Sequence, residues 1–132
     1  MSWPTVAPET LRAAAILTNG AVASSVLDCR NANQVTVAVN FTLGSLTNML
    51  IKVQLSNDKT NWYDYEIDDV TNAVVASTAL NIPARSLQRL FDGSCSLAFQ
   101  VPVKAAYLRL SVLGTGTVTS SSCDITAFLG VA

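Results

Sequence analysis

The residue types that usually carry out catalysis are poorly represented in this chain. It contains no histidine, which removes the usual general base near neutral pH and the commonest transition-metal ligand. A serine or cysteine nucleophile would need a lysine or carboxylate partner, and Lys52, Lys59 and Lys104 lie in no recognisable motif with one. Neither a GxxxxGK nor a GxGxxG phosphate-binding loop occurs. These gaps indicate a protein that is not an enzyme and has no cofactor.

The three cysteines, Cys29, Cys95 and Cys123, are far apart in the sequence and form no CxxC pair. Without histidine and without that spacing they indicate no zinc site, and their odd number argues against a complete disulfide framework. Free cysteine commonly packs as a small apolar residue. We therefore expect three buried, free thiols.

An acidic segment, Asp64 to Asp69, lies beside the aromatic residues Trp62, Tyr63 and Tyr65. Oxygen-rich loops can bind Ca²⁺, but this spacing matches no EF-hand-like ligand order, so solvated negative charge is the simpler interpretation. Aromatic faces beside carboxylates also suit sugar binding. If Tyr63 and Tyr65 share one strand face, Trp62 belongs to the other and packs in the core. We therefore expect core or interface packing here, with a ligand platform as the alternative.

The composition favours contacts with other proteins. Half of the 132 residues are hydrophobic and 13% are charged, about half the usual charged share. No apolar run approaches the roughly 20 residues that span a bilayer, and the net charge of −1 comes without a basic stripe for phosphates. We therefore expect a homo-oligomer with no membrane or nucleic-acid partner. The N-terminus shows no signal-peptide pattern, which predicts folding in the cytoplasm.

Alternation of apolar and polar residues predicts strands along most of the chain. Residues 34–43 show the strongest alternation and should form a central strand, and residues 49–56 have one buried and one wet face. The polar run Ser56 to Asn61 predicts a hairpin return into Trp62. Further strand-like runs lie at 14–18, 22–27, 73–82, 95–101, 105–113 and 117–129, the last two joined by Gly114-Thr-Gly116 as a hairpin.

Two segments depart from this pattern. Pro83 to Phe91 has three apolar residues at helical spacing and is followed by Asp92-Gly93, which predicts one short helix. Residues 1–12 contain two proline dipeptides and almost no charge, which predicts an extended N-terminal arm ahead of a single domain at 13–132. A short helix beginning near Pro8 is the alternative. The arm residues expected to contact a neighbouring subunit are Trp3, Val6 and Leu11.

Eight or nine short strands with at most one short helix predict an all-β fold, an antiparallel β-sandwich or jelly-roll. The stretch Ile51-Lys-Val-Gln-Leu-Ser-Asn-Asp-Lys-Thr-Asn-Trp62 resembles the Trp hairpin of discoidin-like jelly-rolls and of related β-sandwich proteins of tailed-phage virions, with Lys59 at the usual glycine position. Phe99-Gln-Val-Pro102, Ala106-Tyr-Leu-Arg-Leu110 and Gly114-Thr-Gly116 extend the resemblance.

The resemblance implies a structural virion protein, made in the host cytoplasm and then part of the particle. A capsid decoration or cement protein is the expected role, with the major capsid protein or other virion subunits as partners. Because capsid surfaces offer three-fold sites, a trimer is the first hypothesis for the oligomer. A tail or neck position fits the same residues, and a carbohydrate-binding module is the rival from a different class.

Overall fold

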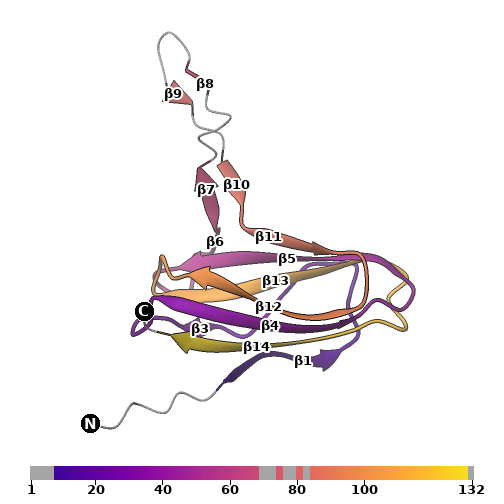
Figure 1. The fold of residues 1–132 in the computed structure, drawn as a ribbon. Coiled ribbons are helices and arrows are strands. Elements are labelled where there is room, and N and C mark those ends of the chain that lie inside the picture. Colours follow the sequence, from indigo (N-terminus) through magenta and orange to yellow (C-terminus); the bar gives the residue numbers. More distant parts are fainter. Residues whose placement is uncertain (1–7, 69–73, 76–79, 82–83, 131–132) are drawn as a thin grey trace.

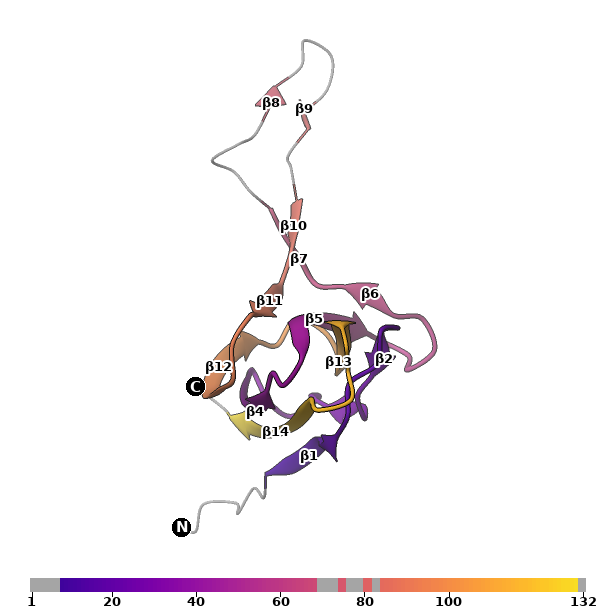
Figure 2. The same ribbon diagram turned by 90° about the vertical axis from the view of Figure 1, so that its right-hand side faces the viewer.

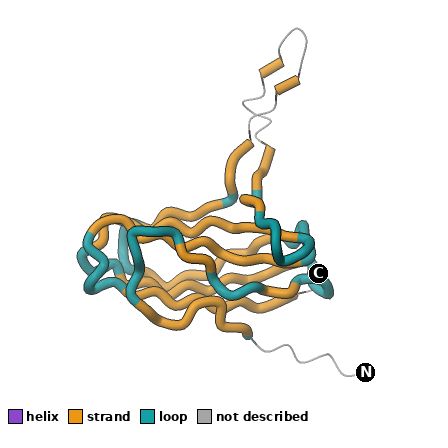
Figure 3. Tube along the Cα trace, turned by 180° about the vertical axis from the view of Figure 1, so that it is seen from behind, coloured by secondary structure: helices purple, strands orange, loops and turns teal. Residues whose placement is uncertain are grey.

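Two antiparallel sheets packed face to face form the body of the protein (Figure 1). The computed structural model describes residues 8–68, 74–75, 80–81 and 84–130. Strands make up most of these residues, and no helix occurs among them (Figure 3). The predicted all-β sandwich is confirmed.

The two sheets contain four and six strands. The first sheet has β1 (Glu9–Ala15) at one edge, then β14 (Ser122–Gly130), β4 (Gln34–Thr42) and β12 (Cys95–Pro102). The second has β11 (Gln88–Phe91), β5 (Leu46–Ser56), β13 (Tyr107–Gly116) and β2 (Val22–Ala23) in that order, with β3 (Leu27–Asp28) also on β13 and β6 (Tyr63–Asp64) also on β5.

The strand order is that of a jelly-roll. If β2 and β3 are counted as one interrupted strand and the short β6 is set aside, the eight strands run 1-8-3-6 in the first sheet and 5-4-7-2 in the second. The first and last strands, β1 and β14, are therefore neighbours. Long-range pairing of this kind joins the beginning of the described chain to its end.

The core lies between the sheets and follows the predicted alternation. In β4 the side chains of Val35, Val37, Val39 and Phe41 are all buried, and β4 is paired on both edges, as expected for a central strand. Ile51 and Val53 of β5 face them from the other sheet and are equally buried. Each such side chain contributes about 1.5–3 kcal/mol through removal from water.

The polar turn after β5 forms as predicted and returns the chain to pair β6 with β5. Ser56 Oγ accepts the Lys59 N–H at 2.9 Å, and Asp58 Oδ1 accepts the N–H groups of Thr60 and Asn61 at 2.9 and 2.8 Å. Lys59 has a φ of 65°, the left-handed conformation for which glycine is usual. The two side chains Ser56 and Asp58 thus replace a glycine-based turn.

These bonds predict a pH-dependent stability. The backbone N–H groups of Asn61 and Thr60 hold the pKa of the Asp58 carboxyl well below its usual range. Since the folded-state pKa is the lower one, the carboxylate stabilises the fold above its unfolded-state pKa of about 4, and this contribution is lost as the pH falls through the folded-state value. We expect Asp58→Ala to melt below wild type at pH 7, with the gap closing toward pH 2. Thermal unfolding at several pH values measures this difference in melting temperature, and the exposed Asp92→Ala variant is the control. A difference that does not change with pH would contradict the prediction.

The helix predicted for 83–91 is wrong. Ala84–Ser86 is a strand, β10, and β11 follows it directly along the exposed edge of β5, from Gln88 opposite Lys52 to Phe91 opposite Met49. Leu90, placed on the apolar face of the expected helix, is 63% exposed. The edge of β5 offers backbone partners to β11, and Glu66–Asp68 offers them to β10. This tertiary pairing overrides the local helical spacing.

The hairpin predicted at Gly114-Thr-Gly116 is also wrong. These residues continue β13 along β5 as far as Leu46, and β13 and β14 lie in different sheets. Gly114 is needed for close packing, because a Cβ there would lie 3.0 Å from Leu17 Cβ and 3.2 Å from the Thr18 carbonyl oxygen. The glycines mark a close approach between segments and not a reversal of the chain.

The N-terminal arm ends earlier than predicted. Glu9–Ala15 pairs with β14, and Leu11 is 3% exposed within the core, so residues 9–12 belong to the sandwich. The second edge of β14 supplies the backbone partners that the sequence pattern did not reveal, and Leu11 closes the core at that edge. Trp3 and Val6 lie outside the described residues.

A long hairpin projects from the second sheet. Its base is the pair β7 (Glu66–Asp68) and β10, with Asp68 opposite Ala84, and the pair β8 (Val74–Val75) and β9 (Leu80–Asn81) lies farther out. Figures 1 and 2 show the β7–β10 pair rising from the edge of the sandwich and the β8–β9 pair farther out, away from the two sheets. The strand-like run predicted at 73–82 thus includes the β8–β9 pair, outside the sandwich.

Candidate functional site

The three aromatic residues of the predicted ligand surface point in different directions. Tyr65, between β6 and β7, is 7% exposed and belongs to the core, whereas Tyr63 is 67% exposed. Trp62 is half-buried on the outer face, so its expected place in the core is wrong. The break between β6 and β7 changes the alternation on which that prediction relied.

The face of Trp62 is covered by a cation. The Arg109 guanidinium carbon lies 4.4 Å from the ring centroid, and Arg109 Nε donates to Gln54 Oε1 at 2.8 Å. Gln54 Nε2 in turn donates to Asp64 Oδ1 at 3.1 Å. Leu108 and Leu110, the neighbours of Arg109, are buried, so Arg109 points outward from the sandwich. In this layer on the outer face of β5 and β13, the Arg109 guanidinium occupies one face of the Trp62 ring.

The acidic segment does not converge on one point. Asp64 faces β5, where it also lies 3.9 Å from Lys52 Nζ, while Glu66 lines a cleft on the other side of the β5 edge. Among the described residues there is no group of three or more Asp, Glu or Cys side chains that could hold a metal ion. Asp69 lies outside the described residues.

The cysteines are free thiols. Cys29 and Cys123 are buried as expected, and burial raises the pKa of each to about 11. Cys95, at the start of β12, is only partly buried, because β12 is an edge strand and its inward side chains are not fully covered. The expectation of burial was therefore wrong for this one thiol.

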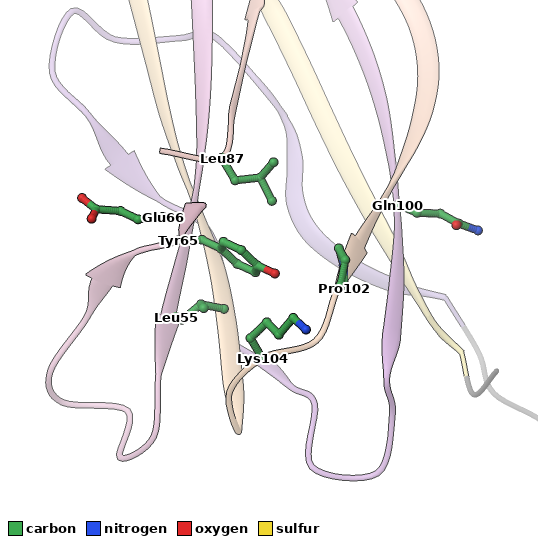
Figure 4. A pocket seen from close by; sticks show the side chains of 7 residues that line it. All are labelled: Leu55, Tyr65, Glu66, Leu87, Gln100, Pro102 and Lys104. Carbon is green, nitrogen blue, oxygen red and sulfur yellow. The ribbon is translucent and has the colours of Figure 1, made fainter. Parts of the chain in front are cut away.

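One hollow, called here the seam cleft, lies between the two sheets beside the hairpin base (Figure 4). It has a volume of about 470 Å³ and is lined by Leu55, Tyr65, Glu66, Leu87, Gln100, Pro102 and Lys104. The Tyr65 ring and Leu87 form one wall, and Pro102 of β12 forms the other. The cleft is mainly apolar, with a carboxylate and an ammonium group at its rim.

Backbone hydrogen bonds around Val53 fix the place where the hairpin leaves the sandwich. The Val53 carbonyl accepts the Tyr65 N–H at 2.9 Å, and the Val53 N–H donates to the Leu87 carbonyl at 3.0 Å. Leu87 N–H also donates to the Tyr65 carbonyl at 2.6 Å. Both arms of the hairpin are therefore held at the edge of β5, next to the seam cleft. Reasoning from the sequence missed this arrangement, because it depends on pairing between distant segments.

The sandwich also exposes large apolar side chains that the core does not use. They are spread over both sheets and the loops, and they are Ile16, Val22, Val26, Tyr63, Leu90 and Phe128. No helix in the described part of the chain is long and apolar enough to cross a membrane.

No protein-family model, curated protein or solved structure matches this chain.

Proposed function

We propose that this protein is a non-enzymatic subunit of a tailed-phage virion, a decoration or cement protein of the capsid shell. The projecting hairpin carries the proposal. Its outer ladder, β8–β9, lies away from both sheets (Figures 1 and 2), and residues 73–82 include seven Ala, Val, Leu or Ile residues and no charge. An uncharged run whose described ladder lies away from the core is a feature of surfaces that pack on another protein.

The surface of the sandwich supports the same role. The chain has 13% charged residues, and six large apolar side chains are exposed on the sandwich. Such a surface is typical of one that other subunits cover in an assembly. A cement protein acts by burying apolar area across joints of the shell, so that opening the shell must expose that area. About 800 Å² of apolar contact corresponds to ~20 kcal/mol before the costs of association are subtracted.

Two other functions remain as outcomes of the test. A tail or neck accessory protein would use the same hairpin and surface on a different virion partner. A carbohydrate-binding module has less support, because Arg109 covers Trp62 and Tyr65 is buried, which leaves Tyr63 as the one well-exposed ring of the three.

The test removes the outer hairpin without disturbing its base. Asp68 pairs with Ala84, so replacing residues 69–83 by Asn-Gly joins β7 to β10 through a two-residue turn. We expect the unfolding midpoint to change by less than about 3 °C, because both sheets are intact. Binding to purified shells of the major capsid protein from the same source, measured by co-sedimentation, should fall at least ten-fold.

Two further variants control for the loss of chain. Asn81→Ser keeps the hairpin and its apolar residues and should bind shells as wild type does. Val75→Lys with Leu80→Lys, a directly opposed pair, should lose binding although the hairpin remains. Wild-type binding by the shortened protein would refute the role of the hairpin. Binding to isolated tails would favour the role of a tail or neck accessory protein. Glycan binding that is lost in Tyr63→Ala would favour the carbohydrate module.

A further inference from the structure

The outer edge of β12 is the longest regular strand edge left open in the described part of the chain. All eight residues of β12 pair with β4 without a register shift, and no described strand pairs with the other side. β1, the opposite edge of the same sheet, contains a glutamate, an arginine and two register shifts, which are common protections of an edge. β12 has no charged residue and no bulge. Such an edge is a ready site for another strand.

The backbone groups on the open edge can be identified. Val103 N–H donates to the Asn33 carbonyl at 3.0 Å, on the side of β4. Because backbone groups alternate in direction along a strand, the odd-numbered residues of β12 face β4 and the even-numbered ones face outward. Pro102 agrees with this, because proline in a strand directs its missing N–H away from the ladder. Ser96, Ala98 and Gln100 therefore present both N–H and C=O at the open edge.

The sequence of residues 2–8 has the matching pattern. Its two prolines, Pro4 and Pro8, have the same parity, so in an extended chain they leave Trp3, Thr5 and Ala7 with complete backbone groups on the opposite side. An antiparallel strand with Trp3 opposite Gln100, Thr5 opposite Ala98 and Ala7 opposite Ser96 uses all three of the open positions. The prolines then lie on the outer side of the added strand, where they block further strand addition.

The side chains fit this register as well. Pro4, Val6 and Pro8 would face inward, opposite Phe99, Leu97 and Cys95, each of which is only half-buried in the structure. All three incoming side chains are apolar. They would cover the narrow gap between β12 and β11, where Leu87 and Phe99 line a small hollow that adjoins the seam cleft.

A chain cannot fill its own edge in this way. The registers align Glu9 of β1 with Ala127 of β14, Val37 of β4 and Phe99 of β12. A strand added outside β12 is therefore four strand spacings, about 19 Å, from Glu9. The four residues from Thr5 to Glu9 span at most ~14 Å. The strand must therefore come from another molecule.

We infer that residues 3–7 of one copy add as an antiparallel strand to β12 of the next copy. The contact joins two different surfaces, so it produces a closed ring or an open chain of subunits. The inference rests on the proposed function in one respect, because both require this protein to work as a subunit of a larger protein assembly.

The first experiment blocks the open edge. Ala98 is exposed and its N–H faces outward, so Ala98→Pro removes an edge donor without removing a bond to β4. We expect sedimentation to show a monomer for Ala98→Pro and for Val6→Asp, with an unfolding midpoint close to wild type. Ala98→Ser should keep the oligomer. Retention of the wild-type oligomer by a folded Ala98→Pro protein would overturn the inference.

The second experiment tests the occupant and the register. In Pro8→Cys the new thiol faces the native Cys95 of the neighbouring copy, and mild oxidation should give an interchain disulfide. The product should be absent in Ala7→Cys, which faces the other side, and in Pro8→Cys with Cys95→Ser. If Ala98→Pro dissociates the oligomer but Pro8→Cys gives no such disulfide, another strand, such as a second β12, occupies the edge and the inference fails.

The outcomes separate the inference from the proposed function. An oligomer that survives Ala98→Pro rejects the strand exchange, and shell binding by the same variant leaves the assembly role in place. A wild-type protein that stays monomeric at high micromolar concentration and binds neither shells nor tails rejects both.

Discussion

Leu11→Ala is expected to lower the free energy of unfolding by about 2–4 kcal/mol, because it leaves a cavity at the edge where β1 closes the core. Leu11 is 3% exposed, and its strand is held to β14 by pairs from Glu9 opposite Ala127 to Ala15 opposite Cys123. The unfolding midpoint should fall by roughly 10 °C in thermal denaturation of the free protein.

Two comparisons make this result specific to the core position. Thr10→Ala, an exposed neighbour in the same strand, should change the midpoint by no more than ~2 °C. Deleting residues 2–7 should also leave the midpoint unchanged, because β1 begins at Glu9. If Leu11→Ala melts like wild type and weakens only assembly, Leu11 acts in an arm as the sequence pattern predicted, and its place in the core is wrong.

Gly44→Ala should be about as damaging, at about 3 kcal/mol. Gly44 has a φ of 57°, which costs any residue with a Cβ about 1 kcal/mol or more, and a Cβ there would collide with the carbonyl and hydroxyl oxygens of Ser120. The Ser120 hydroxyl accepts the Ser45 N–H at 3.0 Å, so moving this loop breaks a contact between the β4–β5 and β13–β14 connections.

Chemical denaturation of Gly44→Ala provides the measurement. The transition midpoint should shift while its slope is retained, because the same surface is exposed on unfolding. Gly20→Ala is the matched control, since no atom lies within 4 Å of a Cβ at that position and its φ is not positive. Equal stability of the two variants would show that the loop containing Ser120 can move aside without loss.

Local alternation was sufficient to predict the strands that build the core. Alternate residues point inward as the period of two requires: Val35, Val37, Val39 and Phe41 of β4, and Ile51 and Val53 of β5. Burying one face of a strand is the largest favourable contribution available to it. The polar run after β5 was likewise enough to predict its turn, since Ser56 and Asp58 satisfy nearby backbone groups. Such features depend on residues close together in the chain.

Pairing between segments far apart in the sequence determined the features that local patterns predicted wrongly. The helix expected at Pro83 to Phe91 became β10, which pairs with β7, and β11, which pairs with β5. The hairpin expected at Gly114 to Gly116 became part of a strand on β5. The β5 partners of β11 and of these glycines lie more than 30 residues away in the sequence. The same holds for residues 9–12, which pair with the end of the chain. Local spacing carries no information about an open strand edge elsewhere in the molecule.

The candidate surfaces show the same division. The sequence alone determined that the chain has few charges, no histidine and an uncharged run at 73–82, because composition does not depend on folding. Only the tertiary structure decided that β8 and β9 belong to a projecting hairpin, that Trp62 lies under Arg109, and that no described strand covers the outer edge of β12. Whether a strand is central or at an edge depends on which segments remain to pair with it, and only the complete jelly-roll determines this.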